Sequence, residues 1–71
     1  MFFEVGKFYV HEGGRHIAVV GEVETYCWGK MLVIEEADST GHSISCVEAG
    51  EEVSESLWVE IGKPEWMELF K

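Results

Sequence analysis

Met31-Leu32-Val33-Ile34 is the longest aliphatic run in the chain, and it lies between Trp28-Gly29 and Glu35-Glu36. Its β-branched members suit a pleated, buried surface. A short continuous apolar run with such flanks is typical of a strand that is buried on both faces. We therefore expect residues 31–34 to form the central strand of a small sheet, with the other apolar residues packed against it.

Length and composition indicate one small domain, residues 1–71. The chain has 71 residues, of which 46% are hydrophobic, a proportion typical of a globular domain and too high for a disordered one. A domain of this size has little room for a deep cleft, so we expect a binding module rather than an enzyme, and no cofactor. No apolar run approaches the ~20 residues of a membrane span. Phe2-Phe3-Glu4 lacks the basic region of a signal peptide, which predicts a cytoplasmic protein.

The charge of the chain restricts its partners. Fourteen acidic residues against five basic ones give a formal net charge of −9. Proteins that bind nucleic acid or anionic membranes cluster their bases, whereas here the bases are scattered at Lys7, Arg15, Lys30, Lys63 and Lys71. We therefore expect no direct nucleic-acid or membrane binding, and a protein partner with a basic surface. The alternative is an acidic mimic of nucleic acid that blocks a DNA-binding protein. The simplest interpretation is that the acidic residues only keep the domain soluble.

Two predicted strands, residues 7–11 and 15–20, flank Gly13-Gly14, which favours a two-residue hairpin turn. Counting outward from that turn places His11 opposite His16. Side chains alternate between the two faces of a sheet. The face predicted to be buried carries Phe8, Val10, Ile17 and Val19, and the other face carries Tyr9, His11, His16 and Ala18.

The histidine pair is a candidate metal site. Opposed on neighbouring strands, the imidazoles of His11 and His16 could both reach one metal ion. Zinc takes three or four ligands, so His42, Glu12 or a partner chain would have to complete the site. The alternative is two exposed histidines without a ligand, since their spacing matches no established zinc motif.

The middle of the chain continues as strands. Gly21 interrupts the second strand and predicts a bulge or bend, a device that curls a sheet. Residues 38–41 form a turn by composition, with a loop of either two or four residues before a strand at 42–47. The register of that strand is therefore open, and Cys46 lies opposite either Val33 or Glu35.

The last third of the chain predicts a loop, a strand and a helix. Residues 48–56 hold four glutamates and have little to bury, which predicts a solvated, mobile loop. Residues 57–61 form the final strand, and Pro64 suits the first turn of a helix that extends to Phe70. Trp66, Leu69 and Phe70 recur at helical spacing as one apolar stripe. We expect this helix to cap the open end of a barrel.

These elements together predict a mostly β protein, a small SH3-like barrel of about five antiparallel strands with a short C-terminal helix. A five-stranded oligonucleotide-binding barrel is the alternative, but its usual basic and aromatic face is not evident. Cys27 and Cys46 are not opposed in either register, so we expect reduced, buried thiols. Along its strand Cys46 lies about 13 Å from His42, too far for a catalytic pair.

The aromatic residues suggest a contact surface. Trp58 alternates out of phase with Leu57, Val59 and Ile61, the expected core residues of the last strand. We therefore predict that Trp58 is exposed and that Tyr9 and Tyr26 join it in a face for protein contact.

Several of these features occur in the same order in a known group of proteins. They are Tyr9, His11, Gly14-Arg15, Gly21-Glu22-Val23, Thr25, Trp28-Gly29, Leu32-Val33, Glu35, Trp58-Val59-Glu60-Ile61, Glu65-Trp66 and Phe70. From Lys7 to Phe70 the chain resembles short uncharacterised bacterial and prophage-encoded proteins described as SH3-like barrels. The resemblance implies that fold and, as a partner, a host or phage protein. It implies no activity.

Nine excess negative charges predict a salt-dependent stability. Screening should relieve their mutual repulsion, so the melting temperature should rise between about 10 mM and about 300 mM salt. Thermal unfolding followed by circular dichroism measures this. A flat or falling response would mean that the acids are locally compensated.

Overall fold

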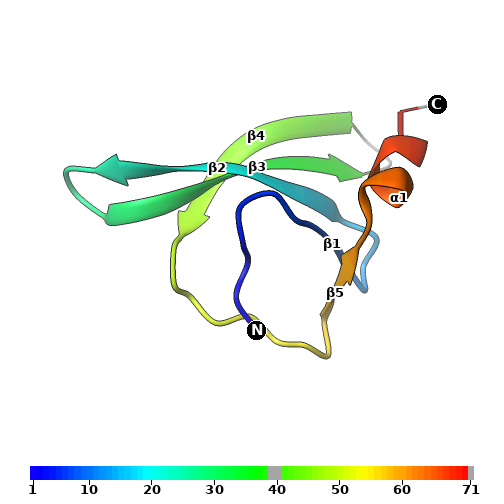
Figure 1. Cartoon of the computed structure of the whole chain (residues 1–71), viewed down its shortest axis with the longest axis horizontal. Coiled ribbons are helices and arrows are strands. Elements are labelled where there is room, and N and C mark those ends of the chain that lie inside the picture. The colour runs from blue at the N-terminus through cyan, green and yellow to red at the C-terminus, as the bar shows by residue number, and fades with distance from the viewer. Residues whose placement is uncertain (39–40, 71) are drawn as a thin grey trace.

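A computed structural model describes residues 1–38 and 41–70. One antiparallel five-stranded sheet has the order β4-β3-β2-β1-β5, and a single short helix follows it (Figure 1). The elements are β1 (Phe8–His11), β2 (His16–Thr25), β3 (Gly29–Asp38), β4 (Gly41–Glu48), β5 (Trp58–Ile61) and α1 (Lys63–Glu68). The expected mostly β fold with a short C-terminal helix is confirmed. The sheet curves but does not close, since β4 and β5 are its two edges.

The aliphatic run of β3 lies one strand away from the centre of the sheet, which β2 occupies. Leu32 and Ile34 are buried on one face, whereas Met31 and Val33 are only half-buried on the other. The prediction of a central strand buried on both faces is therefore wrong. The run has enough apolar residues to bury both faces of β3, but α1 is too short to cover the second face.

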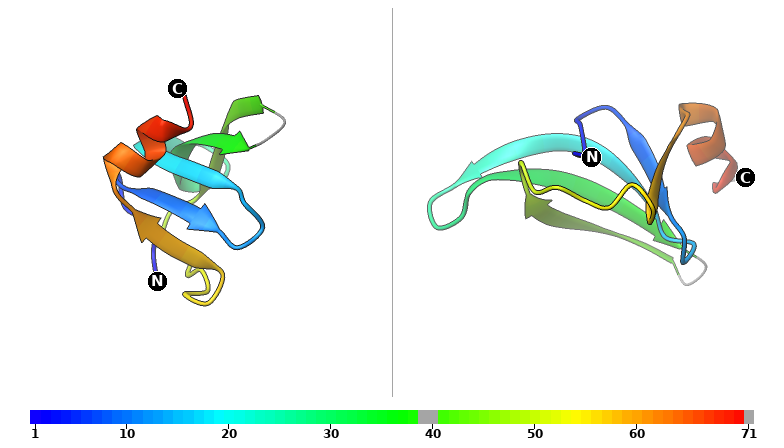
Figure 2. Two further views of the ribbon diagram at one scale, coloured as in Figure 1. Left: turned by 90° about the vertical axis from the view of Figure 1, so that its right-hand side faces the viewer. Right: turned by 90° about the horizontal axis from the view of Figure 1, so that it is seen from below.

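The bend predicted at Gly21 is confirmed. Val19 pairs with Ile34 and Gly21 pairs with Val33, so Val20 is an extra residue in the ladder. Such a bulge increases local twist, and the β2–β3 ribbon curves along its length (Figure 2).

The β3–β4 hairpin takes the shorter of the two predicted loops. Asp38 pairs with Gly41, and Cys46 pairs with Val33. Residues 39 and 40, which belong to the turn predicted at 38–41, lie outside the described residues.

The first hairpin differs from the predicted one by a single residue. His11 N–H donates to the carbonyl of Arg15 (2.7 Å) and Gly14 N–H donates to that of His11 (2.8 Å), so three residues form the turn. Gly14 is left-handed, with φ +94°, which glycine adopts readily. Tyr9 consequently pairs with Ile17. A slip of one residue exchanges the faces of a strand, so the predicted faces of β1 are wrong and those of β2 are right.

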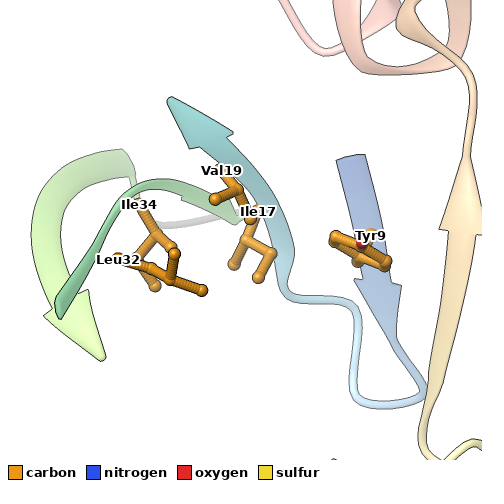
Figure 3. Packing of buried hydrophobic residues seen from close by; sticks show 5 residues of the cluster. All are labelled: Tyr9, Ile17, Val19, Leu32 and Ile34. Carbon is orange, nitrogen blue, oxygen red and sulfur yellow. The ribbon is translucent and has the colours of Figure 1, made fainter. Parts of the chain in front are cut away.

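The slip puts Tyr9 in the main core. Buried side chains from β1, β2 and β3 gather on one side of the sheet, which we call the inner face (Figure 3). These residues are Tyr9, Ile17, Val19, Leu32 and Ile34. The N-terminal segment crosses beneath the arch of the sheet (Figure 1), where Met1 and Phe3 pack against this cluster.

The opposite, outer face has a smaller core beneath α1. Trp66 is 5% exposed and packs against Ala18, Ala37 and Phe8, whose ring centroid lies 5.6 Å from that of Trp66. Phe70 contacts Trp66 and remains 46% exposed. The predicted apolar stripe is therefore buried only at Trp66. The helix packs on the outer face at one end of the sheet (Figure 2) rather than capping a barrel.

Trp66 should be the main anchor of the helix on the sheet, because Phe70, whose ring lies 5.8 Å from that of His42, is 46% exposed. Trp66→Ala should lower the free energy of unfolding by about 3–5 kcal/mol, the usual cost of removing a large buried aromatic side chain. Met67→Ala, at a position 49% exposed on the same helix, should cost less than about 0.5 kcal/mol. Urea denaturation of both variants measures the difference. Equal losses would contradict the assignment of Trp66 as the anchor.

Candidate functional site

A pocket of about 170 Å³ opens on the inner face, where β4 runs into the following loop. The N-terminal segment, β3, β4, the loop and β5 all contribute to its wall. The lining residues are Phe3, Leu32, Val47, Glu48, Gly50, Glu51, Val53 and Trp58. Most of these side chains are apolar, and the two glutamates are exposed at the surface.

The loop between β4 and β5 is tied to the start of the chain. The backbone nitrogen of Met1 donates to the carbonyl of Val53 (2.9 Å), and Val53 N–H donates to the carbonyl of Met1 (2.8 Å). Val53 is half-buried in the pocket wall. The prediction that residues 48–56 have little to bury therefore holds for the glutamates but misses Val53.

Aromatic rings form one side of the pocket. The ring of Phe3 meets Trp58 edge-on, with centroids 5.1 Å apart, and lies 4.7 Å from the ring of Tyr9. His11 packs against Trp58 at 4.8 Å. Edge-to-face contacts of this kind fix the relative orientation of rings, so Trp58 presents a defined surface to the pocket.

A charged network supports Trp58 as well. The guanidinium of Arg15 lies 5.7 Å from the centroid of the Trp58 ring, within the range of a cation–π contact. Arg15 Nε and Nη2 donate to the two carboxylate oxygens of Glu36, at 3.0 and 2.8 Å. This bidentate pair restrains the guanidinium, which in turn restrains the indole.

Negative charge borders the pocket at Glu51. Glu48 also lines the pocket, but its pairing with Met31 puts its side chain on the outer face. Within residues 1–38 and 41–70, neither Glu48 nor Glu51 makes an ion pair, whereas Lys7, Arg15 and Lys30 each lie within 4 Å of a carboxylate. An apolar interior beside a carboxylate suits a ligand with an apolar stem and a positive head. Lysine and arginine side chains have that form.

Tyr9 lies beneath the aromatic wall as a buried support. Its side chain is 1% exposed, and its hydroxyl oxygen accepts a hydrogen bond from Glu4 N–H at 3.0 Å. Burial raises the pKa of Tyr9 above its ordinary value, because the phenolate loses its hydration.

The structure does not bring the three residues of the predicted protein-contact face together. Tyr9 is buried, and Trp58 is half-buried in the pocket wall. Tyr26 is fully exposed in the β2–β3 turn, where Trp28 is 70% exposed. The one-residue slip of β1 explains why Tyr9 is buried. The pairing of Trp58 with His11 places Trp58 on the inner face.

The predicted opposition of His11 and His16 is wrong. His16 pairs with Val10, so the two imidazoles lie on opposite faces of the sheet and cannot share an ion. His11 Nδ1 accepts from Gly13 N–H (3.1 Å), and His16 Nδ1 donates to the carbonyl of Gly14 (2.9 Å). Among the residues that the structure describes, no three His, Cys, Asp or Glu side chains form a group able to hold a metal ion.

Both cysteines are free thiols, and both are exposed. The expectation of buried thiols is therefore wrong. Cys27 lies in the β2–β3 turn and Cys46 lies on the edge strand β4.

The sequence pointed to Trp58 but not to its neighbours. Phe3 and Val53 form the pocket only because residues distant in the chain pack together. Val53, a single apolar residue among glutamates, was the one local signal that this loop packs inward.

No family model matches the chain, and no curated protein or solved structure matches it either. Among the described residues no helix has the length and apolar character needed to cross a membrane.

The raised pKa of Tyr9 predicts a loss of stability in alkali. The protonated phenol favours the folded state, so this contribution is complete below pH 10.0, the ordinary pKa, and disappears as the pH rises above it. Tyr9→Phe should lower the free energy of unfolding by about 1 kcal/mol at neutral pH, because its hydrogen bond is missing. The melting temperature of this variant should fall less steeply in alkali than that of the unmodified protein. Melting temperatures between about pH 8 and about pH 11 test this. Tyr26→Phe, at an exposed position, should behave like the unmodified protein, and a steep alkaline loss in Tyr9→Phe would contradict the assignment.

Proposed function

We propose that this protein is a non-enzymatic interaction module that binds a basic segment of a partner protein. One lysine or arginine side chain of the partner enters the inner-face pocket. The observation that carries the proposal is the apolar pocket with Glu51 at its edge.

The chemistry of the pocket matches such a side chain in two ways. The methylene stem is covered by Leu32, Val47 and Val53, and the positive head lies near Glu51. A hydrogen bond to a charged group contributes about 1.5–3 kcal/mol. The net charge of −9 supports a fast encounter with a basic partner.

The topology supports an SH3-like architecture as part of this proposal. The first strand lies between the second and the last, and β2 bends at its bulge. The open, curved sheet would then be a variant of the SH3-like barrel in which the edge strands β4 and β5 do not pair with each other. SH3 domains bind peptides at aromatic-lined grooves, but a fold alone carries no function, so the proposal rests on the pocket. The sequence resemblance supports a bacterial or prophage origin, and a cytoplasmic location is part of the proposal.

The acidic mimic of nucleic acid remains a prediction with less support. A mimic needs carboxylates in rows with the spacing of phosphates. A carboxylate beside one apolar pocket favours a single cationic side chain instead.

Capped amino acids provide a minimal test of the pocket. Nα-acetyl-arginine amide and Nα-acetyl-lysine amide should shift backbone NMR signals of the residues around Trp58 and Val53, whereas uncharged Nα-acetyl-norleucine amide should shift them far less. A peptide with two or three basic residues should bind more tightly, and salt should weaken it. Equal binding of the norleucine compound, or no shifts at all, would contradict the proposal.

The carboxylate of Glu51 should account for most of the selectivity. Glu51→Gln should weaken binding of the basic peptide about tenfold, since one charge-assisted contact is lost. Glu65→Gln, which removes one negative charge from the distant helix, is the matched control and should change affinity less than about twofold through screening. Isothermal titration calorimetry measures both, and equal losses would assign binding to net charge rather than to the pocket.

A further inference from the structure

The strand β4 leaves a long edge of the sheet open. Its eight residues are nearly all exposed, and β3 is its only neighbour in the sheet. Among residues 1–38 and 41–70, no element lies beyond its outer side (Figure 2). Exposed edge strands normally carry Lys, Pro or a bulge that prevents pairing with another chain. Residues 41–48 contain no Lys, Arg or Pro, and their ladder with β3 has no register shift.

The hydrogen-bond pattern shows which backbone groups face outward. Ala49 N–H donates to the carbonyl of Lys30 at 3.1 Å, so this pair is a hydrogen-bonded one. Hydrogen-bonded and non-hydrogen-bonded pairs alternate along an antiparallel ladder. The N–H and C=O groups that point away from β3 therefore belong to His42, Ile44, Cys46 and Glu48.

The side chains of these four residues also share the outer face, and their order is self-complementary. If a second copy of β4 lies antiparallel with Ser45 opposite Ser45, then His42 faces Glu48 of the second copy. Ile44 then faces Cys46 of the second copy. An imidazole N–H can donate to a carboxylate, and Ile44, 63% exposed in the single chain, gains an apolar neighbour.

We propose that the protein forms a homodimer by pairing the β4 edges of two copies about a two-fold axis at Ser45. The two five-stranded sheets become one continuous sheet, and the outward groups of β4 bond to each other. A two-fold interface requires a surface that complements itself, and the residue order of β4 provides one. Val47 and Glu48 also line the inner-face pocket, so each pocket adjoins the end of this interface.

The charge of the chain sets the strength of the dimer. Each copy carries a net charge of −9, and the contact along one strand is small, so the dimer is weak. Salt screens the repulsion and should strengthen the dimer. If a basic strand of another protein bound this edge instead, salt should weaken that complex. The salt dependence therefore distinguishes the two occupants.

Sedimentation equilibrium of the protein alone tests the proposal without any ligand. From about 10 µM to about 1 mM, the range in which small interfaces become populated, the mean mass should rise from monomer to dimer. The dimer fraction should be larger at about 300 mM than at about 10 mM salt. A monomer under all these conditions would overturn the proposal and leave the peptide-binding pocket unaffected.

Proline substitution on the two edges provides a matched pair. Ile44→Pro removes an outward N–H from β4 without breaking a bond to β3, so it should weaken the dimer at least tenfold. Glu12 N–H donates to the carbonyl of Leu57 at 2.9 Å, and by the same alternation Glu60 N–H points outward from β5. Glu60→Pro should therefore leave the dimer intact. Equal dimerisation of the two variants would overturn the proposal.

Cysteine crosslinking tests the register and does not depend on proline. In a chain carrying Cys27→Ser and Cys46→Ser, Ser45→Cys places two thiols across the axis at a Cα distance of about 4.5 Å, suitable for a disulfide. Mild oxidation should link this variant into dimers. Ser43→Cys in the same background lies on the same face but away from its counterpart, and should not crosslink. Equal crosslinking of both variants would contradict the register.

Discussion

The pairing of Tyr9 with Ile17 is the constraint on which the rest of the structure depends. It places Tyr9 in the inner core and His11 on the same face, beside Trp58 of the neighbouring strand. Trp58 thereby becomes part of a pocket wall. A register shifted by one residue would bury Phe8 and Val10 instead, and would turn His11 away from the indole.

Much of the secondary structure was predictable from the sequence because turns and alternation are local. The strands, the bulge at Gly21 and the helix after Pro64 follow from such signals. The faces of β1 were not predictable. Gly13-Gly14 fits both a two-residue turn and a three-residue turn with Gly14 left-handed, and Phe8, Tyr9 and Val10 are all apolar, so alternation could not choose between them.

The candidate site was predictable only in part, because small sheets cover their two faces unequally. In β5, Val59 looks like a core residue but is 59% exposed, since none of the described residues buries that part of the outer face. Trp58, which looks solvent-facing by alternation, meets Phe3 instead. Contacts between residues 1–3 and 53–58 join segments more than fifty residues apart, and no local pattern announces them.

The position of β5 beside β1 has a consequence for the order of folding. The meander from β1 to β4 needs only hairpin contacts between successive strands, which form quickly. The contact of β1 with β5 joins residues 8–11 to residues 58–61 and closes a loop of nearly fifty residues. Closure of so long a loop is entropically costly. We therefore expect a species in which the first four strands are paired while the wall containing Trp58 has yet to form, and β5 with α1 to complete the molecule last.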